Sequence, residues 1–100
     1  MTNPVAEIVT FTLVPGVSDA DFLALSQRTA AFCEAQSGFR ARRLSRDGEG
    51  RWTDYVLWSD MQTAKDAAAK FPEQDFAPDL MAAIAPDSVM MRHEAVLWEM

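Results

Sequence analysis

The stretch that most constrains the fold is Gly50 to Ala64, GRWTDYVLWSDMQTA, because it joins an aromatic strand directly to a capped helix. From Arg51 to Trp58, aromatic, β-branched and aliphatic residues crowd a run too short for a typical helix, which predicts a strand. Alternation gives this strand two faces, one with Trp52, Asp54, Val56 and Trp58 and the other with Thr53, Tyr55, Leu57 and Ser59. Both faces carry large apolar groups, so both need a cover.

The composition fits one soluble globular domain over residues 1–100. The chain is 49% hydrophobic and 24% charged, and its net charge of -6 argues against a nucleic-acid or anionic-membrane partner. Its apolar runs fall far short of the roughly 20 residues that span a bilayer. The N-terminal sequence lacks a charged region followed by a small-residue cleavage site, so a cytoplasmic protein is expected. The single Cys33 agrees with a reducing compartment.

The first part of the chain predicts a strand followed by a long helix. Val5 to Val14 is β-branched and aromatic, and Pro15-Gly16 ends it. Ser18 and Asp21 resemble a capping box, and the apolar spacing predicts one helix over residues 19–36. Gly38 follows where a left-handed C-cap is expected. Cys33 lies beside the apolar stripe of this helix and is expected to be buried and inert.

A basic hairpin follows. Phe39 to Arg46, FRARRLSR, predicts a second strand, and the Asp47-Gly48 pair predicts the turn into the aromatic strand. Its four arginines suggest either an anion site for a carboxylate or phosphate, or the solvated side of a strand near the sheet edge. The solvated side is the favoured interpretation. The arginines are Arg40, Arg42, Arg43 and Arg46.

The last third predicts two helices and a strand. Asp60 caps an alanine-rich helix that ends at Pro72, and Phe76, Leu80 and Ile84 recur at the spacing of a further short helix. Ser88 to Met100 predicts the fourth strand. The order β-α-β-β-α-β is that of an α+β, ferredoxin-like fold with a four-stranded antiparallel sheet. Because helices cover only one sheet face, we expect a homodimer that packs the two open faces together, with an apolar space between the sheets.

The segment RWTDYVLWSDMQTAKDAA resembles the dimeric α/β-barrel superfamily, especially the antibiotic biosynthesis monooxygenase type. The resemblance extends over almost the whole chain in element order. It implies a homodimeric barrel and a cavity for a small aromatic or polyketide-like molecule. Members include cofactor-independent monooxygenases, haem-degrading enzymes, isomerases, cyclases and proteins of no known activity.

The haem-degrading members provide the poorest match. They use an Asn on the first strand, a Trp near the end of the third, and a His about ten residues further on. Trp58 matches the Trp, but the first strand has Thr10 and Thr12 instead of Asn, and the position ten beyond Trp58 is Ala68. The resemblance therefore implies no haem, and cofactor-independent oxygenation implies no other cofactor.

The candidate catalytic residues are His93, Tyr55 and Asp54. Histidine is the side chain that most readily exchanges protons near neutral pH, and His93 is the only one in the chain. Tyr55 could donate a hydrogen bond to a substrate oxygen, and Asp54 could orient His93 or pair with Arg42 or Arg43. Each of the three residues also has a purely structural interpretation, such as a histidine held by a hydrogen bond in the sheet or dimer interface.

The candidate ligand-binding residues are Trp52, Trp58, Thr10 and Thr12. No metal site is expected, since one histidine and scattered carboxylates show no ligand spacing. Two hypotheses follow: a cofactor-free monooxygenase or proton-transfer isomerase, and a protein that binds a small hydrophobic molecule, or simply dimerises, without chemistry.

Overall fold

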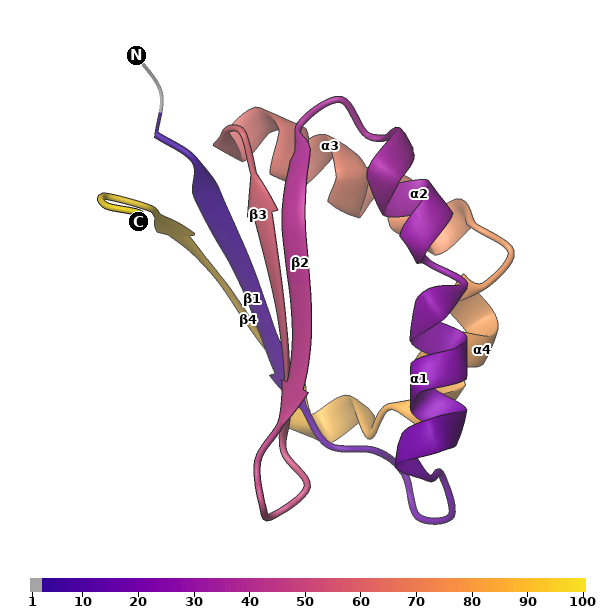
Figure 1. The fold of residues 1–100 in the computed structure, drawn as a ribbon. Helices are drawn as coiled ribbons and strands as arrows, with labels where there is room; N and C mark the ends of the chain where they lie inside the picture. Colours follow the sequence, from indigo (N-terminus) through magenta and orange to yellow (C-terminus); the bar gives the residue numbers. More distant parts are fainter. Residues whose placement is uncertain (1–2) are drawn as a thin grey trace.

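The computed structural model describes residues 3–100 and shows a four-stranded antiparallel sheet with all helices on one face (Figure 1). The strands lie in the order β2-β3-β1-β4, so β2 and β4 are the edges. This confirms the predicted α+β ferredoxin-like fold. The strands are β1 (Val5–Phe11), β2 (Phe39–Arg46), β3 (Trp52–Trp58) and β4 (Met90–Ala95). The helices are α1 (Asp19–Gln27), α2 (Ala30–Ala35), α3 (Met61–Lys70) and α4 (Ala77–Ala83), with 3-10 turns at Phe71–Glu73 and Pro86–Ser88.

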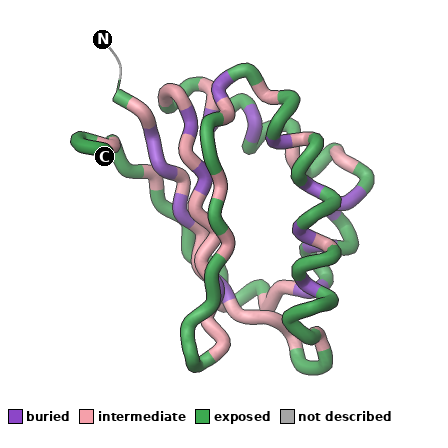
Figure 2. Tube along the Cα trace, viewed as in Figure 1, coloured by how far each residue is buried: buried purple, intermediate pink, exposed green. Residues whose placement is uncertain are grey.

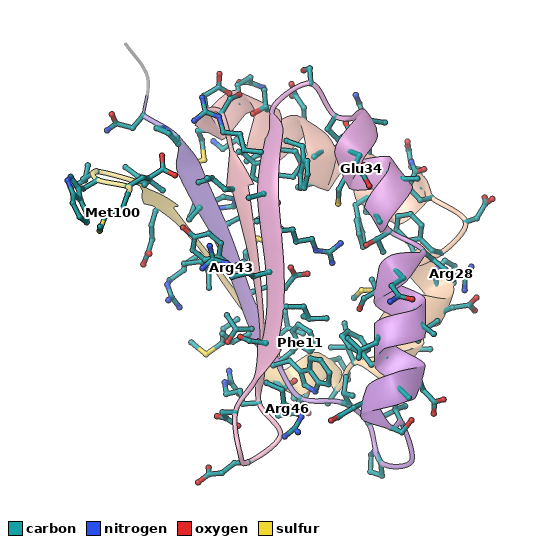
Figure 3. All side chains as sticks on the ribbon, viewed as in Figure 1. Phe11, Arg28, Glu34, Arg43, Arg46 and Met100 are labelled. Carbon is teal, nitrogen blue, oxygen red and sulfur yellow. The ribbon has the colours of Figure 1, made fainter. Side chains whose placement is uncertain are left out.

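The strand register decides which side chains meet the helices. Glu7 on β1 lies opposite Val56 on β3 and His93 on β4, so these three residues share the helix-facing side. Figure 3 shows Phe11 on this side and Arg43 on the open side of the sheet. The predicted division of the aromatic strand is confirmed: Trp52, Asp54, Val56 and Trp58 face the helices.

Two buried clusters join the helices to the sheet. In the first, Phe22 of α1 sits between Phe11 and Trp52, with ring centroids 5.4 and 5.0 Å away. In the second, Ala64 and Ala67 of α3 pack on Val56 and Trp58. Small side chains let α3 lie close to the sheet, and Figure 2 shows burial concentrated in the central strands and the inner sides of the helices. Burying such apolar surface is the main favourable contribution to folding.

The single helix predicted over residues 19–36 is wrong: the chain forms α1 and α2, separated at Arg28 and Thr29. The Thr29 hydroxyl donates to the carbonyl oxygen of Ser26 at 2.6 Å, which offers the backbone an alternative to continuing the helix. Thr29 is also fully buried. The capping box at Ser18 and Asp21 is confirmed.

Two glycine predictions need correction. Gly38 has no left-handed backbone; instead, a Cβ there would collide with the Thr63 side chain, so glycine is needed for close approach to α3. In the hairpin, Gly50 rather than Gly48 has a positive φ, +85°. Asp47 Oδ1 accepts from the backbone N–H groups of Glu49 and Arg51, at 2.9 Å each, which builds a longer turn than an Asp-Gly pair alone.

The first and the last strand along the chain are both shorter than predicted. The β1 strand ends at Phe11, although Leu13 still pairs with Ile84 through an isolated bridge. The β4 strand begins at Met90, because the Ser88 hydroxyl bonds to the Ala85 carbonyl at 2.6 Å and closes a 3-10 turn. Among residues 3–100, no helix has the length and apolar character to cross a membrane.

Candidate functional site

A cavity of about 340 Å³ lies between the sheet and the helices of this one chain. Its walls are mainly apolar, and the charged side chains that reach it are Glu7, Arg42 and Asp54. This volume is at the lower end of the range for small-molecule sites. The ligand space predicted from the sequence lies between the sheets of two copies, whereas this cavity is on the other side of the sheet. Charged side chains on the helix-facing side account for the cavity there, because charged groups do not pack into a core without water as apolar side chains do.

Arg42 is the most highly bonded side chain in the cavity. Its Nε and Nη2 donate to the two carboxylate oxygens of Asp54 at 3.0 and 2.8 Å. Its Nη1 donates to Thr29 Oγ1 and lies 3.7 Å from Cys33 Sγ. One arginine of β2 thus connects β3 to both helices at the α1–α2 break. The favoured interpretation of the four arginines as solvated is wrong for Arg42, because the helix-facing register turns its side chain inward.

Burial and hydrogen bonding act together on the pKa values of Arg42 and Cys33. Burial lowers the pKa of the Arg42 guanidinium, but its hydrogen bonds to Asp54 and the charge of that carboxylate outweigh burial and leave the pKa raised. Burial raises the pKa of the Cys33 thiol above its usual 9.0, and the charge of Arg42 offsets this only in part. Arg42 and Asp54 therefore neutralise each other, and Cys33 is a buried thiol, as the sequence predicted.

Glu7 and His93 form a second polar pair. They are direct neighbours across β1 and β4, and His93 Nε2 lies 2.9 Å from Glu7 Oε2. Glu7 lines the cavity, whereas His93 lies on the edge strand and reaches the cavity only through Glu7. The sequence leaves Asp54 either to orient His93 or to pair with Arg42 or Arg43; the structure pairs it with Arg42. His93 meets Glu7 instead, which the sequence does not single out. The only sequence feature that marks Glu7 is its position, as a carboxylate on the more apolar side of the first strand.

Two buried polar atoms at the cavity have no hydrogen-bond partner among the described residues. They are the indole Nε1 of Trp58 on β3 and the Oγ of Ser26 on α1, and both residues line the cavity. Buried polar groups are nearly always paired, and an unpaired one is costly. Both residues thus bring an unpaired polar group to the cavity wall.

The structure separates the seven predicted site residues. Asp54 and Trp58 line the cavity, Trp52 is buried in the first core cluster, and His93 lies behind Glu7. Tyr55 and Thr10 lie on the opposite sheet face, because side chains alternate along a strand.

On that face Tyr55 packs under Arg43, 5.7 Å from the ring centroid, and Thr10 accepts from Arg51 Nη2 at 2.9 Å. Thr12 lies beyond β1, where its backbone N–H donates to Ser88 Oγ at 2.9 Å. Tyr55, Thr10 and Thr12 therefore do not share a site with Asp54 and Trp58.

Solved structures with the same architecture cover nearly the whole chain. A single-residue variant of SnoaB, a cofactor-independent oxygenase from Streptomyces nogalater, is 22% identical, with a TM-score of 0.80 over 98% of this chain and 97% of that chain. A provisionally assigned antibiotic biosynthesis monooxygenase from Bordetella bronchiseptica is 21% identical, with a TM-score of 0.82 over 97% of this chain and 100% of that chain. The chain has the fold of the antibiotic biosynthesis monooxygenase type.

This fold also occurs where no function is known. Protein NE2512 of unknown function from Nitrosomonas europaea is 16% identical, with a TM-score of 0.72 over 99% of this chain and 94% of that chain. No family model and no curated protein matches the sequence. Identities this low show a shared fold only, so the chemistry has to be inferred from the cavity itself.

Proposed function

We propose that this chain is a monooxygenase-like enzyme that needs no cofactor and acts on a small aromatic or polyketide-like molecule in the cavity between its sheet and helices. The observation that carries the proposal is the pair of unpartnered polar atoms, on Trp58 and Ser26, in a cavity whose walls are mainly apolar. A flat molecule with oxygen atoms at two places suits such walls.

The chemistry requires an electron-rich substrate anion and dioxygen. The substrate loses a proton, its anion passes one electron to dioxygen, and the radical and superoxide combine into a peroxide. Loss of water then leaves a new carbonyl group, so one oxygen atom enters the product and the other leaves as water. The protein binds the substrate, excludes bulk water and stabilises the anion; the Trp58 N–H is a donor available for that last role.

The proposal is tested by oxygen uptake with hydroxyaromatic substrates of the anthrone and hydroquinone classes. We expect uptake above the uncatalysed rate and incorporation of one labelled oxygen atom from ¹⁸O₂, measured by mass spectrometry. Ala68→Phe should fill the cavity from α3 and reduce turnover at least about tenfold. Ala69→Phe is the matched control, since Ala69 is the next residue and does not line the cavity, and this variant should keep the wild-type turnover.

Uptake that is unaffected by Ala68→Phe would place turnover outside the cavity and contradict the proposal. Binding in the cavity without uptake for any substrate would instead support the non-catalytic ligand-binding protein. That second candidate rests on the same two unpartnered atoms, since they indicate a ligand rather than a reaction.

We also propose that the protein works as a homodimer that covers the open face of the sheet. The support is the distribution of exposed apolar side chains, which is greatest along β4 and the segment after it. Met90, on the open face, is 67% exposed, and Leu97 and Trp98 are 84% and 77% exposed. Exposed apolar groups gathered at one edge favour association.

A further inference from the structure

The Glu7–His93 pair links the cavity to the sheet edge. The Glu7 and His93 side chains are 14% and 23% exposed, so both are largely screened from water. Glu7 is on a central strand and lines the cavity, while His93 is on the edge strand β4. One hydrogen bond of 2.9 Å thus joins the cavity-lining carboxylate to a partly solvent-exposed imidazole.

The other titratable groups around Glu7 do not compete for this role. Asp54 on the neighbouring strand β3 and Arg42 on the more distant β2 line the same cavity, but they are bonded to each other through both carboxylate oxygens. Cys33 faces it from α2 as a neutral thiol, because burial raises its pKa. Of the charged side chains that line the cavity, Glu7 is therefore the one whose only ionic partner in the described chain is a histidine.

We propose that Glu7 is a catalytic residue whose carboxylate accepts the hydroxyl proton of a neutral hydroxyaromatic ligand, and that His93 is a positioning residue that donates its Nε2–H to the same carboxylate. The ligand O–H bond breaks, the proton forms a new O–H bond on Glu7, and the ligand oxygen keeps the electron pair. Glu7 ends as a neutral carboxylic acid, and the ligand becomes the anion that oxygenation needs.

The same geometry predicts that a ligand carrying a carboxylate is rejected, because Glu7 would face it with like charge. This inference rests on the proposed function for its purpose, but it is tested by binding alone.

The test compares 2-naphthol with its methyl ether, 2-methoxynaphthalene, and with 2-naphthoate, by calorimetric titration without oxygen. The naphthol should bind at least about tenfold more tightly than the ether, because only the naphthol donates a hydrogen bond to a charged group. Naphthoate should bind more weakly than either. Glu7→Gln should bring the naphthol-to-ether ratio close to one and leave ether affinity unchanged. Glu94→Gln, an exposed carboxylate on β4, is the control that should keep the ratio.

A second measurement needs no substitution, since His93 is the only histidine and its ring nitrogens give a unique ¹⁵N signal. Naphthol should shift the Nε2 signal, because a protonated Glu7 accepts the Nε2–H more weakly than a carboxylate does, and the methyl ether should not. Equal affinities for naphthol and ether, or no binding of either, would overturn the role of Glu7. An unchanged His93 signal on naphthol binding would overturn proton transfer to Glu7.

The result of the naphthol binding test can be distinguished from the result of the oxygen-uptake test of the proposed function. A naphthol preference with a responding His93 but no oxygen uptake from any substrate would refute oxygenation and leave this inference standing. Oxygen uptake together with equal affinities for naphthol and ether would support oxygenation and refute the role of Glu7.

Discussion

At the scale of single residues, the helix-facing side of the sheet is unusual for its charge. Glu7, Arg42 and Asp54 lie where most small α+β proteins place aliphatic side chains, and each is held by a specific partner. The N–H donors of the Arg42 guanidinium contact two carboxylate oxygens, a hydroxyl and a sulfur atom. The planar arrangement of these donors matches the two oxygens of a carboxylate well. The pair shapes the cavity, but it need not add much net stability, because both charges lose water.

The Arg42–Asp54 pair gives a residue-scale prediction. Asp54→Asn should destabilise the protein by ~2–3 kcal/mol, because it leaves the Arg42 charge without a counter-charge where both side chains are only about one-fifth exposed. The double variant Arg42→Leu/Asp54→Leu should be less destabilised than the sum of its single variants, since no lone charge remains. Urea unfolding monitored by tryptophan fluorescence measures both.

Glu94→Gln breaks the exposed Arg92–Glu94 pair and serves as the control. It should change stability by no more than about 0.5 kcal/mol. Additive effects of Arg42→Leu and Asp54→Leu would show that the two side chains do not act as a pair.

At the scale of elements, close packing between the β2 entry and α3 positions the cavity wall. The backbone N–H of Ser59 donates to the carbonyl of Gly38 at 2.8 Å, and Asp60 caps α3 through the backbone N–H of Thr63 at 2.9 Å. The start of α3 is therefore tied to the strand pair beneath it. Because Ala67 and Ala68 of α3 line the cavity, any shift of this helix changes the shape of the site.

Gly38→Ala is the element-scale prediction. The added methyl group would overlap the Oγ1 and Cβ atoms of Thr63, so α3 must move or the backbone must strain. We expect a loss of ~1–3 kcal/mol, measured by thermal or urea unfolding. Gly48→Ala is the matched control, since a methyl group at that position would have no neighbour within 4 Å, and it should be near neutral. A neutral Gly38→Ala would mean that α3 can shift away from Gly38 at little cost.

At the scale of the whole molecule, the two sheet faces have different tasks. The helix-facing side makes the core and the cavity, while the open side has only Ala6 and Ile8 well buried among its strand residues. Helices leave that side uncovered (Figure 1). Its apolar groups and the exposed β4 edge are what a second copy would cover.

The homodimer gives the whole-molecule prediction. Light scattering after size-exclusion chromatography should show about twice the 11.1 kDa chain mass. Met90→Lys places a charge on the open face at a position already exposed, so it should shift the protein toward monomer without unfolding it. Leu23→Lys, on α1 in the helix layer, is the control and should leave the mass unchanged. A monomeric wild-type protein at micromolar concentration would contradict the dimer.

Local signals along the chain were enough to predict the element order, the ferredoxin-like fold and the faces of β3. Alternating hydrophobicity, the Ser18 and Asp60 caps and the hairpin each act over a few residues, so they can be recognised without knowing what packs against them. The same signals left Asp54 either to orient His93 or to pair with Arg42 or Arg43, and only the tertiary structure selects Arg42.

The candidate site, in contrast, depends on contacts between distant parts of the chain. The antiparallel register brings Glu7 to His93 although 86 positions separate them in sequence, and one step along β2 sends Arg42 inward and Arg43 outward. At the break between α1 and α2, the Thr29 hydroxyl likewise accepts from Arg42, a contact from another element. Contacts between distant strands leave no local pattern in the chain, because register is fixed by the packing of the whole sheet against its helices.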